Sequence, residues 1–186
     1  MKYYSLLLFA GLALFTACDD EEPIGPGGGG EEEIITTLTY TLTPQSGGDV
    51  VTLNFEDLDG NGGNAPTITG GTLAANTTYT GAITLLNASK TPAENITEEI
   101  EEEDDEHQFF FNSTVDGLTV AYDDADDDGN PVGLQTEVTT GDAASGDLTV
   151  ILLHEPAKDA EGVADGDIDN ADGDADIEVT FPVTVQ

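Results

Sequence analysis

The stretch Leu38-Thr39-Tyr40-Thr41-Leu42-Thr43 alternates apolar and hydroxyl side chains without a break. Successive side chains of a β-strand point to opposite faces, so this stretch predicts a strand with one apolar face and one threonine face. Such a two-faced strand is typical of an antiparallel sheet that covers a core on one side only.

The same alternation recurs along the rest of the chain. Its apolar members are Val51, Leu53 and Phe55; Tyr79, Ile83 and Leu85; Leu118, Val120 and Tyr122; Leu148, Val150 and Leu152; and Ile177, Val179, Phe181 and Val183. Clusters of Gly, Asn and Asp separate these groups and predict turns. We therefore expect an all-β fold over residues 34–186, an immunoglobulin-like antiparallel β-sandwich of about seven to nine strands.

Residues 92–106 break the alternation. Thr91-Pro92-Ala93-Glu94 has the form of a capping box with proline at the first helical position, and Ile96 and Ile100 follow one turn apart. We expect a short helix here, with its isoleucines packed on the end of the sandwich. The acidic residues crowded between Glu98 and Glu106 weaken this prediction, because like charges one turn apart repel.

The N-terminus resembles a bacterial lipoprotein signal. Lys2 precedes an apolar run over residues 5–15, and Leu14-Phe15-Thr16-Ala17-Cys18 resembles a lipobox. The run is too short for a permanent membrane span, which needs roughly 20 residues. We expect residues 1–17 to be a signal peptide and Cys18, the only cysteine, to be the lipid attachment site; the alternative is an ordinary signal peptide with a chance cysteine.

Residues 18–33 are acidic and rich in Gly and Pro, which predicts a lipidated tether without a core of its own. The acids directly after Cys18 have two interpretations, retention at an inner membrane or export to the cell surface. We favour export, and expect the protein to be anchored at the outer membrane, on either its cell-surface or its periplasmic face.

Negative charge dominates the composition. Beyond Lys2 the cations are Lys90 and Lys158, and these two lysines against 39 Asp and Glu give about −37. Such a surface repels nucleic acid and anionic head groups, so we expect no nucleic-acid partner. Solubility in a salty medium explains most of these acids equally well.

Three acidic loops are candidate Ca²⁺ sites, because oxygen ligands at alternate positions are what the first half of an EF-hand loop supplies. Their candidate ligands are Asp57, Asp59 and Asn61; Asp124, Asp126 and Asp128; and Asp165, Asp167 and Asp169, a run that continues to Asp172, Asp174 and Asp176. No loop completes the motif, and turns favour the same residues. Ca²⁺ is the only cofactor that this pattern suggests.

The histidines, His107 and His154, are candidate ligands of a transition metal. If their strands were neighbours, the two imidazoles and a glutamate could hold Zn²⁺ or Cu²⁺. The alternative is a structural role at a strand end. Next to His107, Phe109, Phe110 and Phe111 place aromatics on both faces of one strand, which favours a central strand buried on both sides over an exposed Phe110.

No motif of nucleophilic catalysis is found in the sequence, so we expect no enzymatic activity. The stretches Phe55 to Pro66, Asp105 to Phe109 and Leu153 to Pro156 resemble small, uncharacterised surface lipoproteins of the Bacteroidetes type, some of which carry the label "type 1 periplasmic binding fold" protein. That label implies a larger α/β fold, with which the strand pattern disagrees. The resemblance implies a binding or accessory module beside an outer-membrane transporter; the alternative is a cation-binding module.

Overall fold

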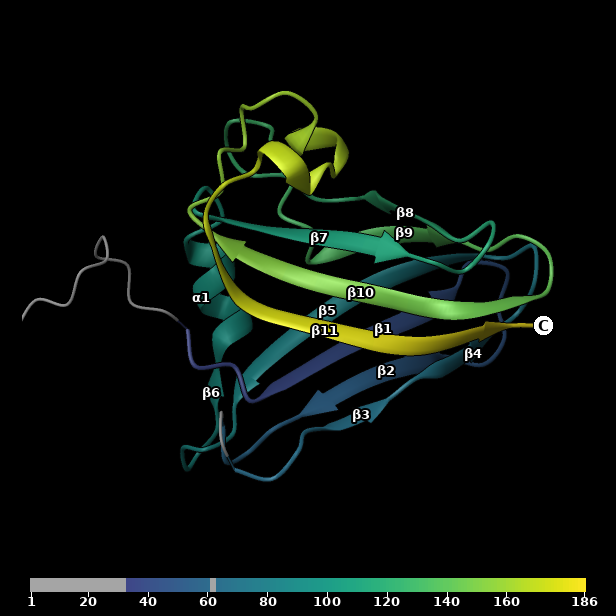
Figure 1. The fold of residues 1–186 in the computed structure, drawn as a ribbon, viewed down its shortest axis with the longest axis horizontal. Coiled ribbons are helices and arrows are strands. Elements are labelled where there is room, and N and C mark those ends of the chain that lie inside the picture. The colour runs from purple at the N-terminus through teal and green to yellow at the C-terminus, as the bar shows by residue number, and fades with distance from the viewer. Residues whose placement is uncertain (1–32, 61–62) are drawn as a thin grey trace, which may run out of the picture. The chain divides into compact units, whose positions relative to one another are not determined.

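Two β-sheets stack on each other in the computed structural model, which describes residues 33–60 and 63–186 (Figure 1). The prediction of an all-β sandwich is confirmed. The predicted signal peptide, the lipid attachment site Cys18 and the tether up to residue 32 lie outside the described residues.

The larger sheet has the order β3-β2-β1-β5-β9-β8, with β6 paired to β5. Its strands are β1 (Thr37–Pro44), β2 (Val51–Glu56), β3 (Thr67–Thr69), β5 (Thr78–Asn87), β6 (Glu94–Asn95), β8 (Thr119–Tyr122) and β9 (Gln135–Thr139). The smaller sheet has the order β4-β11-β10-β7. Its strands are β4 (Gly71–Leu73), β7 (His107–Ser113), β10 (Ala144–His154) and β11 (Asp174–Val185). The pairing of β4 with β11 is parallel, and the other pairings of the described strands are antiparallel.

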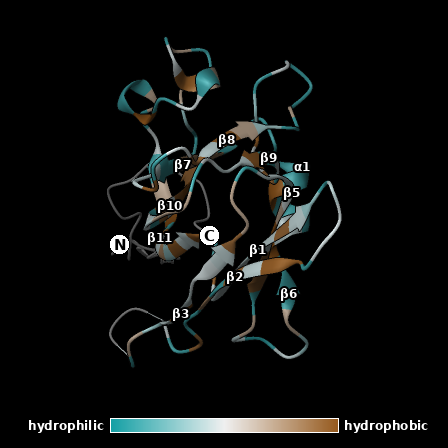
Figure 2. Ribbon diagram, turned by 90° about the vertical axis from the view of Figure 1, so that its right-hand side faces the viewer, coloured by the Kyte–Doolittle hydropathy of each residue, from teal (hydrophilic) through white to brown (hydrophobic). Residues whose placement is uncertain are grey.

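The core lies between the sheets, where the predicted alternation places it. On β1, Leu38, Tyr40 and Leu42 are buried, and the threonines between them face away from the core. Hydrophobic residues concentrate in the strands, whereas the connecting loops are mainly hydrophilic (Figure 2). Each long strand therefore contributes one face to the core, as period-two patterning requires.

Helix α1 (Ile96–Glu102) closes one end of the sandwich and is shorter than the predicted span of residues 92–106. Ile96 and Ile100 are buried, as predicted. The helix starts later because Glu94 and Asn95 pair with the end of β5 as strand β6. Sheet pairing thus prevails over the local capping signal. Among the described residues, no helix is long and apolar enough to cross a membrane.

Strand β7 is buried on both faces, as predicted, but it is an edge strand and not a central one. Its inner face carries Phe109, whereas Phe110 points outward into a second apolar cluster with Leu153, Val163 and Ala171. The two short 3-10 helices η1 (Val163–Asp165) and η2 (Ile168–Asn170) belong to the segment that covers Phe110. The open edge is covered as well, because the amide of Phe109 donates to the carbonyl of Val132 at 2.7 Å.

Candidate metal centre

The two histidines lie side by side at the end of the smaller sheet. His107 begins β7, His154 ends β10, and the two residues are directly paired in the antiparallel ladder. Their rings stack with centroids 4.7 Å apart and an interplanar angle of 16°. Both side chains lie on the inner face, next to the position where α1 closes the sandwich. The structure thus provides the proximity on which the predicted transition-metal site depended.

One hydrogen bond orients the imidazole of His107. Its Nδ1 lies 3.0 Å from the carbonyl oxygen of Glu103, the residue that caps the C-terminal end of α1. A carbonyl can only accept, so Nδ1 carries a proton and, in the neutral ring, Nε2 carries the lone pair. Ligating histidines in metalloproteins are commonly held in this way, with the other ring nitrogen bonded to a carbonyl or carboxylate.

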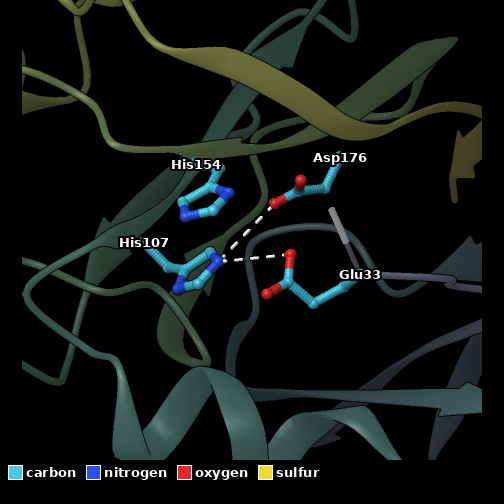
Figure 3. Close-up of side chains that lie close together, drawn as sticks. All are labelled: Glu33, His107, His154 and Asp176. Carbon is cyan, nitrogen blue, oxygen red and sulfur yellow. Dashed lines mark ion pairs between the residues drawn. The ribbon is translucent and has the colours of Figure 1, made fainter. Parts of the chain in front are cut away.

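Two carboxylates from distant parts of the chain face this Nε2 (Figure 3). Glu33 Oε2 lies 3.4 Å away and Asp176 Oδ2 lies 3.7 Å away. The side chains of Glu33, His107 and Asp176 are no more than 6% exposed. Glu33, His107, His154 and Asp176 each offer one ligand atom, and these atoms all lie within 4.8 Å of one another. We call these four residues the inner cluster.

A β-bulge places Asp176 in the inner cluster. Leu152 pairs with Ile177 on β11, but the next residue of β10, Leu153, pairs with Ala175. Asp176 is therefore the extra residue that β11 carries at this bulge. Bulges change the direction in which a side chain points and often lie beside functional sites. Here the carboxylate is almost fully buried beside His107 instead of facing solvent.

The charge of the inner cluster is not balanced by any lysine of the described residues. Lys90 pairs with Glu94, and Lys158 pairs with Asp126 at 2.9 Å. The sequence contains no arginine. Buried carboxylates are costly unless a cation or a proton accompanies them. A bound cation would balance the charge of Glu33 beside His107.

The ligand set matches a transition metal better than Ca²⁺. Two imidazoles and two carboxylates suit Zn²⁺ or Cu²⁺, whereas Ca²⁺ takes six to eight oxygen ligands. Bonds of about 2.0–2.1 Å in a tetrahedral zinc site place ligand atoms about 3.3–3.4 Å apart. The observed 3.4 and 3.7 Å between His107 Nε2 and the two carboxylates lie close to that spacing.

The candidate Ca²⁺ loops are built as turns. Asp57 Oδ1 accepts from the amide of Gly60 at 3.0 Å, and Asp59 Oδ2 accepts from the amide of Asn64 at the same distance; Asn61 lies outside the described residues. Such local bonds from Asp side chains to backbone amides are common in turns and loops. The Asn64 contacts also hold the pKa of Asp59 below its usual value.

In the other two loops, Asp side chains likewise accept hydrogen bonds from backbone amides. Asp124 accepts from the amides of Gly133 and Gln135, each at 2.7 Å, and Asp167 caps Asp169 at 3.0 Å. Asp126 accepts from two backbone amides, including that of Asp128, as well as from Lys158. Apart from Asp176 at the end of the third run, none of the described candidates joins a group of three or more acidic or His side chains with ligand atoms within 4.8 Å of one another.

Sequence reasoning identified the two histidines but not their carboxylate partners. The sequence pattern places Asp176 in the third acidic loop, and nothing local indicates the bulge that turns it inward. The pattern places Glu33 in the tether as the last of three consecutive glutamates, and no signal distinguishes it from Glu31 or Glu32. The structure places Glu33 against the domain.

A separate hollow of about 300 Å³ lies at the other end of the sandwich, near the C-terminal ends of β1 and β11. Its lining includes Gly47, Gly48 and Ala74, together with Val51 and Tyr79. Among the described residues that line it, Asp49 is the one with a carboxylate side chain. The hollow therefore lacks the group of convergent polar side chains that the inner cluster has.

Comparisons with known proteins find no matching family model, no similar curated protein and no similar solved structure.

Proposed function

We propose that this domain is a binding module for a divalent transition-metal ion, Zn²⁺ or Cu²⁺, held by Glu33, His107, His154 and Asp176. The observation that carries the proposal is the environment of His107 Nε2. This nitrogen is fully buried, makes no hydrogen bond with any described residue, and faces Glu33 Oε2, which likewise has none. In the neutral ring this nitrogen carries a lone pair, and a cation between it and the facing carboxylate oxygens would be attracted to all of them.

The ligand count favours binding or stabilisation over catalysis. Catalytic zinc sites keep one position open for water, whereas sites with four protein ligands are closed. The near-complete burial of Glu33, His107 and Asp176 agrees with a closed site. A buried cation at this position would also link strands β7, β10 and β11 to the segment before β1.

We further propose that the module is a lipoprotein anchored through Cys18, at the outer membrane. The lipobox-like Leu14 to Cys18 and the acidic residues after it support this location. Replacement of Cys18 by Ser should move the protein from the membrane fraction to the soluble fraction, and should abolish labelling by a fatty-acid analogue. Unchanged labelling would contradict the anchor. The accessory role beside a transporter remains a prediction from the sequence resemblance.

The metal proposal is tested on the full chain carrying Cys18→Ser, which removes the only thiol. Elemental analysis after purification without chelator, followed by calorimetric titration with Zn²⁺, Cu²⁺ and Ca²⁺ in turn, should reveal a tight transition-metal site with a stoichiometry near one. Tight binding of Ca²⁺ alone, or no bound ion and no heat, would refute the proposal.

Matched variants assign the ligands. His107→Asn and Glu33→Gln should each weaken Zn²⁺ binding by at least tenfold, because each removes one ligand. Glu56→Gln makes the same chemical change at an exposed position of β2 and should leave the affinity unchanged. Equal losses in Glu33→Gln and Glu56→Gln would indicate general electrostatic attraction and not ligation by Glu33.

A further inference from the structure

His154 belongs to a second group of ligand atoms on the outside of the inner cluster. Glu106, His154 and Glu155 also offer ligand atoms that lie within 4.8 Å of one another. We call these three residues the outer cluster. Glu106 and Glu155 are exposed, whereas His154 is buried. The outer cluster therefore lies between solvent and His154, the buried residue that it shares with the inner cluster.

The geometry directs one nitrogen of His154 outward. His154 Nε2 lies 3.7 Å from Glu106 Oε2, and the Glu106 side chain is 51% exposed. The other side of the ring faces the inner cluster, where Asp176 and His107 lie (Figure 3). The ring therefore lies between the two clusters, with Nε2 toward Glu106. The backbone holds the two acids together, because the amide of Glu155 donates to the carbonyl of Glu106 at 2.7 Å.

We propose that the outer cluster is a capture site, from which a divalent cation passes through His154 to the inner cluster. This inference rests on the proposed function. The side chains of the three other inner ligands are no more than 6% exposed, whereas the side chain of His154 is 9% exposed. Of the four inner ligands, His154 therefore has the largest exposed fraction. A cation from solvent first meets the exposed carboxylates of Glu106 and Glu155, which replace part of its hydration shell.

The two positions share His154, and a neutral imidazole has one lone pair, so this residue serves one position at a time. Burial sets the order of the two positions. The carboxylate of Glu106 is exposed, whereas Glu33, His107 and Asp176 have side chains no more than 6% exposed. A cation from solvent therefore reaches the outer position first.

The prediction concerns rates and not affinity. Removal of a capture site should slow association and dissociation in the same proportion, because the bound state itself is unchanged. In stopped-flow mixing of the full chain carrying Cys18→Ser with Zn²⁺ and a competing fluorescent chelator, Glu106→Gln with Glu155→Gln should slow loading at least fivefold. The Zn²⁺ affinity at equilibrium should stay within twofold of the parent.

The control separates capture from the general attraction of a negative surface. Glu101→Gln with Glu102→Gln removes two exposed carboxylates from α1, at the same end of the sandwich, and should change the rate by less than twofold. Equal slowing in both double variants would overturn the inference, as would an unchanged rate in the first. A fall in affinity equal to the fall in rate would overturn it too, since Glu106 and Glu155 would then be ligands of the final site. Absence of Zn²⁺ binding to the parent would refute the proposed function itself, together with this inference.

Discussion

His107 and His154 occupy paired positions on β7 and β10, and their imidazole rings stack 4.7 Å apart in the buried end of the sandwich. The antiparallel ladder itself therefore brings the two rings together, one from each strand. His107 and His154 each offer one ligand atom to the same group of four residues, together with Glu33 and Asp176. Imidazole nitrogens of this kind are common ligands of Zn²⁺ and Cu²⁺.

The first prediction is that Zn²⁺ stabilises the folded domain. A ligand that binds only the folded state, at 100 times its dissociation constant, adds about 2.7 kcal/mol to the free energy of unfolding. For a domain of this size, that corresponds to a rise in melting temperature of about 5–10 °C. Calorimetric melting with and without Zn²⁺ measures the shift. His107→Asn should lose most of it, and a full shift in that variant would contradict ligation by His107.

The second prediction concerns the buried ion pair between Lys158 and Asp126. The two side chains are almost fully buried, and Lys158 Nζ also donates to the carbonyl of Asp104. Lys158→Met leaves a buried carboxylate without its cation, so we expect a loss of about 3–5 kcal/mol in the free energy of unfolding. Denaturant titration measures it. Adding Asp126→Asn to Lys158→Met should recover part of the loss, and no recovery would show that the lysine acts through packing alone.

The third prediction is a pH dependence that arises from Asp126. Burial acts to raise the pKa of Asp126, but the hydrogen bond and charge of Lys158 and the amides of Asn130 and Asp128 together hold it below its usual value. Its stabilising contribution is therefore present above the unfolded-state pKa of about 3.9 and is lost as the pH falls from there through the folded-state value. The difference in unfolding free energy between wild type and Asp126→Asn should shrink over that range. A difference that stays constant from pH 7 to pH 2.5 would contradict the shift.

The fourth prediction concerns the contact of Tyr40 with Gly81. The Tyr40 hydroxyl and Thr136 Oγ1 share a buried hydrogen bond of 2.6 Å, and a Cβ at position 81 would lie 2.3 Å from that Oγ1 and 2.7 Å from a carbon of the Tyr40 ring. Gly81→Ala should therefore cost about 1–3 kcal/mol of stability through overpacking. Denaturant titration of Gly81→Ala against wild type measures the loss. Wild-type stability in Gly81→Ala would show that the ring moves freely.

The strand faces could be predicted from the sequence because they depend on a local period of two. Leu38, Tyr40 and Leu42 need no knowledge of their partners to be assigned to one face. The helix boundary could not be predicted, because pairing of Glu94 and Asn95 with β5 outcompetes the capping signal before them. Local propensity is a weak indicator wherever tertiary pairing is available.

Of the four residues of the inner cluster, only the two histidines could be predicted as metal ligands from the sequence. Both histidines lie on the inner face of their strands. For His154 this follows from alternation, which places it on the same face as Leu152. The pairing of β7 with β10 depends on the topology of the sheet. The sequence pattern does not fix that topology, so the metal site could be predicted only if the two strands were neighbours. Asp176 depends on a bulge, and Glu33 depends on the path of the chain before β1. Both features are set by packing and not by a residue pattern.

The last prediction concerns the segment between Glu33 and β1. Glu33 contributes to the inner cluster, Ile34 is 63% exposed, and the chain joins the sheet where the amide of Thr36 donates to Leu86 at 3.0 Å. Ligation of a cation by Glu33 would hold both ends of this short connection, so Zn²⁺ should slow hydrogen exchange of the amides of Ile34 and Ile35. Mass spectrometry of exchanged, protease-digested full chain measures the effect.

Two comparisons make this result specific. In Glu33→Gln the slowing should disappear, because the ligand is lost while the rest of the connection is kept. The amides of Asp49 and Val50, in the turn at the opposite end of β1, should exchange at the same rate with and without Zn²⁺. Slowing at both ends would show global stabilisation, whereas slowing confined to Ile34 and Ile35 would place the cation where the predicted tether from Cys18 meets the domain. Bound metal would then fix the point at which the tether ends.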